Sequence, residues 1–241
     1  MDDKIQGVVL HLLRYGDSSL IVKIYTLNAG LQTFMVKGCR GKNSRNRVAL
    51  FQPMTFLRFV QSGKPRPGGM AFLKDPELLY AYQSIPMVMN KSAILMYLSE
   101  LLSRTLTQQE RNDALFEFVY QSVVWLDLVE TGYANFPLYF TLELSRFLGF
   151  YPQPDYGEGT CFDMMEGHFV RQEPPHPYYL DRDQSAMLAR LLNLGIDELS
   201  SVTMTGNQRN VLLDGILTFM HLHAPVLRDL QSHAVLKEVL R

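Results

Sequence analysis

The sequence predicts an α+β protein in which a small five-stranded β-barrel precedes a larger helical bundle domain with an irregular insertion. Three observations lead to this fold class. Short runs of strand-forming residues fill the first 75 positions, apolar residues recur at helical spacing after Pro86, and proline and glycine interrupt that spacing at 150–182. We therefore expect two domains, over residues 1–82 and 83–241.

The first 75 residues read as strands separated by turns. Residue types that suit a pleated surface concentrate in runs over 5–13, 20–26, 31–37, 54–60 and 70–73. Gly16 and Gly30 stand in tight turns, and residues 38–47 and 61–69 form longer loops. Five strands with variable loops match the plan of the OB-fold, a barrel that binds oligonucleotides through one sheet face and its adjoining loops.

The remainder of the chain has a helical apolar period. The predicted helices cover residues 94–106, 115–126, 137–149, 184–193, 207–222 and 232–240. Thr107 to Glu110 form a predicted capping box before the second helix, Pro137 suits the first turn of the third, and Gly195 is placed to end the fourth. The insertion at 150–182 is expected to hold a small hairpin.

Charge is unevenly distributed along the chain. The total is −1, but residues 1–75 carry twelve lysines and arginines against four acidic residues, whereas residues 76–241 carry eleven against twenty. This polarity indicates two modules with different partners. No apolar run reaches the ~18 residues of a membrane-spanning helix, and the first residues lack a signal-peptide layout, so we expect a cytoplasmic protein without a membrane partner.

The strongest functional feature is a basic run in the first long loop. Its cations, with no acidic residue among them, are Lys37, Arg40, Lys42, Arg45 and Arg47. Such density suits a polyanionic backbone, whose condensed counterions are released on binding, and five contacts to a single strand predict a log–log salt slope of about −3.5. The predicted neighbours of this DNA-binding site are Arg14, Lys23, Arg58, Lys64 and Arg66. The alternative is a solvated surface loop.

Aromatic residues of the same module offer stacking platforms for bases, although most are expected in the core. They are Tyr15, Tyr25, Phe34, Phe56, Phe59 and Phe72.

No catalytic motif accompanies these residues. Gly38 to Ser44 lack the spacing of a nucleotide-binding P-loop, and there is no nucleophile elbow, zinc-protease helix or dinucleotide fingerprint. Cys161 with His168 or His176 falls short of four zinc ligands. A magnesium-dependent nuclease would have to use loop acids, namely Asp155, Glu158, Asp163 and Glu166. We predict a non-enzymatic protein with no cofactor and no metal.

The helical domain is acidic and rich in methionine. Methionine surfaces can receive a partner peptide, although core filling accounts for most of these residues. Arg104, Arg111 and Arg146 are sparse cations in this module and are predicted to engage a partner's carboxylate tail.

Several short motifs follow one another in a distinctive order. They are Gly7-Val8-Val9-Leu10, Tyr15-Gly16-Asp17-Ser18-Ser19-Leu20-Ile21-Val22, Tyr25-Thr26, Gly30-Leu31, Val36-Lys37-Gly38 with basic residues following, and Phe147-Leu148-Gly149-Phe150-Tyr151-Pro152. Their order and spacing resemble the RecO family of bacterial DNA repair and recombination mediators, over nearly the whole chain.

The resemblance implies an OB-fold and a helical domain that bind single- and double-stranded DNA and anneal complementary strands. It also implies partnership with RecR and with the acidic C-terminal tail of single-strand-binding protein, RecA loading in the RecF recombination pathway, and a nucleoid-associated location. Many members carry a four-cysteine zinc cluster in the insertion, where this sequence retains only Cys161. We expect aromatic packing to replace the metal, through Phe162, Phe169, Tyr178 and Tyr179.

The preferred interpretation is a DNA-annealing mediator, whose cations neutralise phosphates and need no bond chemistry. The alternatives are an RNA-binding OB-fold protein, a protein–protein adaptor and a metal-dependent nuclease.

Overall fold

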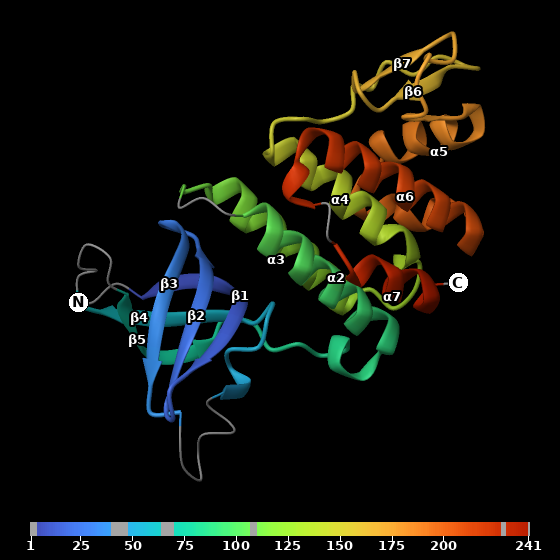
Figure 1. Ribbon diagram of the computed structural model, residues 1–241. Coiled ribbons are helices and arrows are strands. Elements are labelled where there is room, and N and C mark those ends of the chain that lie inside the picture. Colours follow the sequence, from blue (N-terminus) through green and yellow to red (C-terminus); the bar gives the residue numbers. More distant parts are fainter. Residues whose placement is uncertain (1–3, 40–47, 64–69, 107–109, 228–229, 241) are drawn as a thin grey trace. The chain divides into compact units, whose positions relative to one another are not determined.

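The computed structural model describes residues 4–39, 48–63, 70–106, 110–227 and 230–240. The chain folds into two compact units: residues 1–83 with 99–121 form unit 1, and residues 84–98 with 122–241 form unit 2. A β-barrel comes first in the sequence and helices follow, which confirms the predicted α+β class (Figure 1). The domain boundary after residue 82 stays a prediction.

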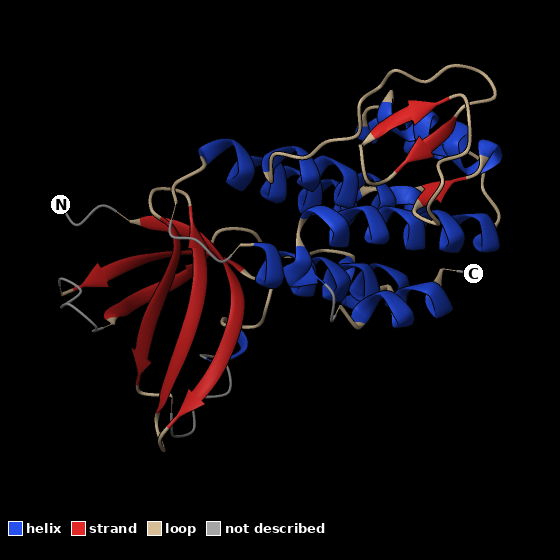
Figure 2. Cartoon of the chain, turned by 45° about the horizontal axis from the view of Figure 1, so that its top comes forward, coloured by secondary structure: helices blue, strands red, loops and turns tan. Residues whose placement is uncertain are grey.

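Unit 1 contains a closed barrel. Its strands are β1 (Ile5–Tyr15), β2 (Ser19–Thr26), β3 (Gly30–Lys37), β4 (Phe56–Ser62) and β5 (Ala71–Leu78). They pair in the order β1-β2-β3-β5-β4, and β4 pairs with β1 to close the barrel. Every pair is antiparallel except β3 with β5. Figure 2 shows the strands in red. The predicted OB-fold is confirmed.

The barrel interior is filled by alternate side chains of these strands. Phe34 and Phe59 meet edge to face at its centre, with ring centroids 5.0 Å apart, and are packed by Val22 and Ile24, which are fully buried. The turns that reverse the chain use Gly16 and Gly30, with φ of 59° and 62°, values that a residue with a Cβ adopts only with strain.

Two long helices contribute residues to both units. They are α2 (Met89–Thr105) and α3 (Asp113–Leu128). In unit 1, Phe56 on the outside of the barrel packs against Phe116 and Tyr120 of α3, with centroid distances of 6.4 and 5.1 Å. The Asn112 side chain accepts the N–H of Leu115 at 2.9 Å and caps α3. Asn112, rather than the predicted capping box at 107–110, therefore caps α3, and residues 107–109 lie outside the described residues.

Unit 2 is helical. Besides its parts of α2 and α3, it contains η1 (Ile85–Met87), η2 (Tyr133–Asn135), α4 (Phe136–Phe147), α5 (Arg182–Leu192), η3 (Ile196–Ser201), α6 (Gly206–His223), η4 (Pro225–Leu227) and α7 (Ser232–Val239). Pro137 in the first turn of α4 and Gly149 after its end are confirmed, the glycine with a φ of 86°. Gly195 does not end α5, because it is extended at φ −80° and instead precedes η3.

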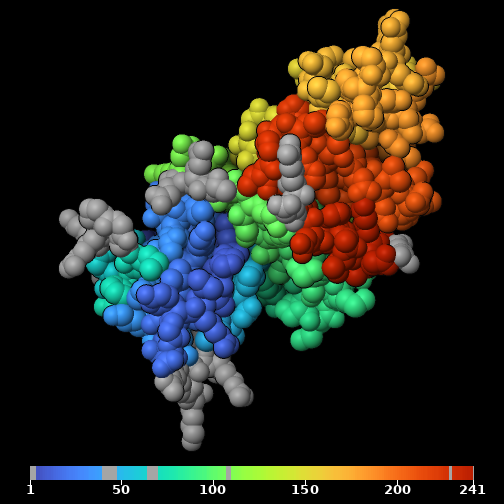
Figure 3. All heavy atoms as spheres, in the orientation of Figure 1, coloured from blue at the N-terminus to red at the C-terminus, as the bar shows by residue number. Residues whose placement is uncertain are grey.

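The insertion folds as a small sheet of β6 (Cys161–Asp163), β7 (His168–Val170) and β8 (Tyr179–Leu180), in the order β7-β6-β8. It forms the yellow and orange lobe of unit 2 in Figure 3. Phe162 packs against Phe169 and against Phe219 of α6, with centroids 5.1 and 5.5 Å apart. Phe162 and Phe169 therefore pack in the lobe as expected, whereas Tyr178 is 42% exposed and contacts only the His176 ring among the aromatic contacts described, with centroids 6.1 Å apart.

A buried lysine of α2 links Ser84, which precedes this helix, to the end of α3 in unit 2. Lys91 is 2% exposed, and its ammonium donates to the Ser84 hydroxyl and to the carbonyls of Asp127 and Val129 at 2.6, 3.0 and 2.6 Å. Asp127 in turn accepts the N–H of Ser84 and of Ile85 at 2.8 Å. Burial lowers the pKa of Lys91, and the nearby Asp127 partly offsets this.

Within the described ranges, no helix combines the length and the apolar character needed to cross a bilayer.

Candidate nucleic-acid interface

The predicted basic site is only partly within the described residues. Arg40, Lys42, Arg45, Arg47, Lys64 and Arg66 lie outside them. The described members are Lys37, Lys23, Arg14 and Arg58, and all four are exposed. Their strand positions decide which of them share a face.

An apolar row crosses the outer face of the barrel. The strand registers place Leu13 opposite Ile21, Ile21 opposite Met35, and Met35 opposite Phe72. Leu13 is 54% exposed and the other three are half-buried. We call these four residues the apolar row. Solvent-facing apolar side chains that are contiguous across four strands indicate a surface that binds another molecule.

Lysines flank the apolar row on both sides. Lys23 lies two residues after Ile21 in β2, and Lys37 lies two residues after Met35 in β3. Lys74 stands two residues after Phe72 on β5. Because alternate residues of a strand point to the same face, these exposed lysines share the face of the apolar row, roughly 7 Å from it along each strand. Apolar contact and positive charge are therefore interleaved at the spacing of two strand residues.

Lys37 and Phe72 are in direct contact. The Lys37 ammonium lies 4.3 Å from the centroid of the Phe72 ring. Such a cation–π contact at an exposed site is worth about 0.5–1 kcal/mol, less than the ~1–3 kcal/mol of a base stacked on an aromatic ring. An incoming base can therefore displace the ammonium from the ring. Lys37 directly precedes the basic loop at 38–47, and Phe72 follows the second long loop at 61–69. This contact therefore links two residues that flank the two loops in the sequence.

Helical residues of unit 1 cover part of this outer face. Ser103 of α2 donates to the carbonyl of Leu10 at 3.0 Å, and the Tyr25 hydroxyl lies 3.5 Å from the carbonyl of Asn112. Burial, with a smaller contribution from Asp113, raises the pKa of Tyr25 to about 12. The helical residues of unit 1 thus protect the Leu10 and Tyr25 end of the face and leave the apolar row open.

Two predicted cations do not join this face. Arg14 pairs with buried Leu20, so strand alternation puts it on the opposite side of the sheet from Lys23 and Lys37. Arg58 on β4 lies 3.6 Å from Glu77. Lys4 also binds Glu77, at 2.8 Å, and lowers the pKa of this carboxyl through its hydrogen bond. The Arg58 charge is therefore already partly neutralised.

The aromatic residues divide as expected between core and surface. Phe34 and Phe59 fill the barrel, and Tyr25 and Phe56 are buried beneath helical residues. Tyr15, 54% exposed, and half-buried Phe72 remain on the surface. Sequence reasoning did not single out Leu13, Ile21 and Met35. Their signal was the absence of polar alternation in β1, where Val8 to Leu13 is apolar except for His11.

The three arginines predicted to bind a partner's tail each pair with a nearby carboxylate. Arg104 lies 3.0 Å from Glu100, Arg111 lies 2.6 Å from Asp113, and Arg146 lies 3.2 Å from Glu143. Arg146 also stacks on Tyr151, 3.8 Å from its centroid. All three pairs form between neighbours in sequence, so an incoming carboxylate would have to compete with an existing partner.

The insertion lacks a metal-ligand cluster in the part of the chain that the structure describes. The buried carboxylate of Asp163 accepts the N–H groups of Met165 and Glu166 at 2.8 and 3.2 Å and lies 3.4 Å from the His176 ring nitrogen. Asp155 accepts the N–H of Phe169 at 3.2 Å. These acids stabilise turns and strands, and burial raises the pKa of the Cys161 thiol, which disfavours the thiolate that zinc requires.

Comparison with known proteins agrees with this architecture. Residues 1–82 match the family model described as Recombination protein O N terminal, and residues 88–229 match Recombination protein O C terminal. The chain is 35% identical over 240 residues to the DNA repair protein RecO of Phocaeicola vulgatus, 34% over 241 residues to that of Bacteroides fragilis, and 31% over 241 residues to that of Flavobacterium psychrophilum. Each alignment covers 99% of both chains. The chain therefore belongs to the RecO family of DNA repair proteins.

Proposed function

We propose that this protein binds single- and double-stranded DNA and anneals complementary single strands without bond chemistry. The observation that carries the proposal is the apolar row flanked by Lys23, Lys37 and Lys74 on the open face of the barrel. Single-strand-binding barrels combine such surfaces: bases contact apolar or aromatic side chains, and phosphates lie beside cations. The basic loop at 38–47 follows Lys37 directly in the sequence and carries four further cations.

Annealing follows from charge neutralisation. Two strands that approach each other in solution repel through their phosphates, and a shared positive surface reduces this repulsion. Phe72 is the one aromatic member of the apolar row, so a base gains little stacking energy from the other three residues. Weak stacking suits annealing, because bases must leave the protein to pair with the second strand. This accounts for the role without any catalytic group.

The physiological role we propose is RecA loading in the RecF pathway. In this role the protein acts with RecR on strands coated by single-strand-binding protein, whose acidic tail it binds, and it works in the cytoplasm at the nucleoid. Membership of the RecO family supports this role. Arg104, Arg111 and Arg146 remain proposed contacts for the tail, in competition with their present carboxylate partners.

The direct test is annealing of complementary fluorophore- and quencher-labelled oligonucleotides without ATP. Wild type is compared with Phe72→Ala, and with a variant in which Lys37 and the four basic-loop arginines and lysines are all alanine. Tyr178→Ala, which removes an exposed ring from unit 2, is the matched control. We expect both barrel variants to slow annealing and the control to match wild type.

Two results would count against the proposal. Annealing at wild-type rates by both barrel variants would exclude this face, and tighter binding of RNA than of DNA of equal sequence would favour the RNA-binding alternative. RecA filament formation on coated strands, with and without RecR, tests the proposed role separately.

A further inference from the structure

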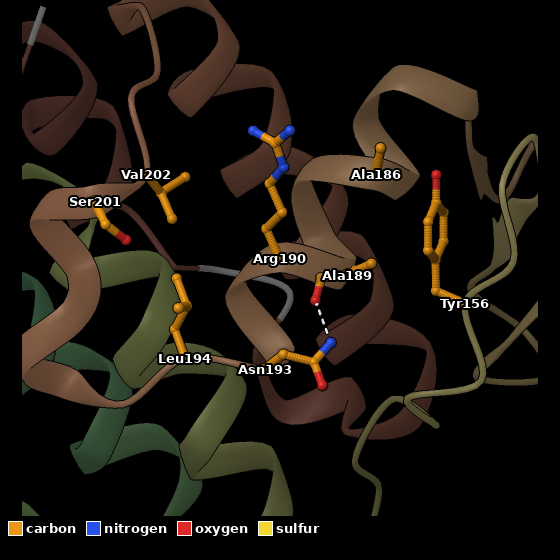
Figure 4. A pocket seen from close by; sticks show the side chains of 8 residues that line it. All are labelled: Tyr156, Ala186, Ala189, Arg190, Asn193, Leu194, Ser201 and Val202. Atoms are coloured by element: carbon orange, nitrogen blue, oxygen red, sulfur yellow. Dashed lines mark hydrogen bonds between the residues drawn. The ribbon is translucent and has the colours of Figure 1, made fainter.

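A small hollow in unit 1 begins at one of the lysines that flank the apolar row. Its volume is about 200 Å³, and it is lined by residues of β1, β2, β3 and the end of α2, namely Leu10, His11, Lys23, Leu31, Ser103 and Leu106. A wider cavity of about 580 Å³ lies beside α5 in unit 2, where Figure 4 shows it between Tyr156 and Val202. Of these two cavities, the smaller one alone shares a residue, Lys23, with the face proposed to bind DNA.

A β-bulge shapes this hollow. The strand register shifts between Val9 and His11, so Leu10 has no opposite residue in β2. Val9 points into the barrel core, and strict alternation would turn His11 inward as well. The extra residue instead places His11 on the open face, directly opposite Lys23. The Leu10 carbonyl accepts the Ser103 hydroxyl at 3.0 Å, which holds the end of α2 against the bulge.

The hollow has apolar walls and a polar, cationic rim. Leu10 and Leu106 are buried and Leu31 is half-buried, so leucine side chains form the walls. His11 and Lys23 are exposed at the rim, and among the described residues no carboxylate forms an ion pair with either. A flat apolar ring suits the walls, and an anion suits the rim. A nucleotide combines these two groups.

We infer that this hollow receives one base turned out of a bound single strand, and that Lys23 and His11 hold the adjoining phosphate. The base lies against Leu31 and Leu106. The Ser103 hydroxyl has already donated its proton, so its oxygen can accept an N–H of the base edge. The volume lies below the ~300 Å³ at which sites for drug-sized ligands begin, which suits one ring system. The inference rests on the proposed function and adds a site for a base to its phosphate contacts.

Charge and continuity favour a nucleotide over a peptide here. Residues 1–75 carry twelve lysines and arginines against four acidic residues, which attracts a polyanion. Lys23 belongs both to the hollow and to the face proposed for DNA. A strand that crosses Ile21 therefore reaches the hollow within two strand residues, roughly 7 Å. The hollow thus lies on the path that the lysines already define.

A site for a turned-out base lets the barrel distinguish single strands from duplex. A base of a single strand turns outward at the cost of its stacking, whereas a base in duplex also has to break its pair. The phosphate contacts of the lysines are open to both forms of DNA. The hollow therefore adds affinity for single strands that duplex does not gain. A strand that has found its complement loses this contact, which favours its release.

The test is fluorescence polarisation with the full-length protein and three labelled DNAs of equal length: a single strand, an abasic single strand that keeps every phosphate, and a duplex. We expect Leu31→Ala to weaken binding of the strand with bases about fourfold, the effect of losing contact with roughly one buried CH₂ group, and to leave the abasic strand and the duplex unchanged. Leu106→Ala is expected to give the same pattern. His11→Ala weakens both single strands equally, because it removes a phosphate contact. The matched control is Leu78→Ala, which removes a leucine that is 45% exposed and lies outside the hollow.

Equal affinity of wild type and Leu31→Ala for the strand with bases would overturn the inference. An equal loss for the abasic strand or for the duplex would also overturn it, because the leucine would then act without a base. Thermal melting confirms that each variant folds, and Leu106→Ala keeps the test valid if Leu31→Ala does not. Failure of the wild type to bind any of the three DNAs overturns the proposed function together with this inference. Wild-type binding that both leucine variants retain overturns the inference alone.

Discussion

Replacing Lys23, Lys37 and Lys74 together by alanine tests whether the open face of the barrel contacts DNA phosphates. All three lysines are exposed and share the face of the apolar row. Each phosphate contact to a single strand contributes about −0.7 to the log–log salt slope, so losing three contacts makes the slope shallower by about 2.1. Between 50 and 200 mM salt, the affinity advantage of wild type over the variant then shrinks about 20-fold.

The assay is fluorescence anisotropy of a labelled oligonucleotide at several salt concentrations. The matched control replaces Arg58, Arg104 and Arg111 by alanine. This variant loses the same three positive charges, but from residues of unit 1 that pair with carboxylates. We expect its slope to remain near that of wild type. If the two variants flatten the slope equally, the salt dependence reflects net charge, and the assignment of phosphate contacts to this face is refuted.

Four further outcomes are expected. Phe72→Ala lowers affinity for single strands by a factor corresponding to about 1–3 kcal/mol of lost stacking, while Phe72→Leu loses less, as equilibrium titration measures. Tyr25→Phe reduces the loss of stability at high pH, because the raised pKa means that the contribution of Tyr25 is present below its usual pKa near 10 and is lost as pH rises through about 12. Denaturation at pH 9 to 12 checks this, and the part of the loss that is due to Tyr151, whose pKa is also raised to about 12, remains. Lys91→Met lowers the free energy of unfolding by about 1–3 kcal/mol, measured in urea, because buried carbonyls lose their donor. A chelator leaves the melting temperature unchanged, and stoichiometric zinc with a large melting shift would contradict this.

The barrel could be predicted closely because its strands are regular. Four of its strands were predicted to within two residues at both ends. Runs of β-branched and aromatic residues bounded by glycine rarely form any structure other than a strand. The exception was β5, which continues past Leu73 to Leu78. This part of β5 contains Pro76 and Asp75, and the φ of Asp75 is positive at 49°. Both features are uncommon in strands, so the strand propensities of the residues did not predict it. Antiparallel pairing with β4 holds this irregular segment in the sheet.

The candidate site was predictable only in part, because charge is visible in a sequence whereas a shared face is not. Lys23 and Lys37 were identified, but the distinction from Arg14 depends on strand register, which only the pairing of β1 with β2 settles. The pairing of Arg58 with Glu77 depends on a contact between β4 and β5. None of these long-range relations has a local signal.

The short pairing between β3 and β5 makes the stability of the barrel depend on what lies on its face. Among the described residues these parallel strands share the pairs Phe34–Ala71 and Met35–Phe72, whereas β2 and β3 pair along their whole length. A short parallel ladder opens at a lower free energy than a long antiparallel one. If DNA binds across Met35 and Phe72 as proposed, it bridges this seam, and at a concentration 100-fold above its Kd it adds about 2.7 kcal/mol to the closed state. Slower amide exchange at Phe72 in the complex would reveal a barrel that its ligand completes.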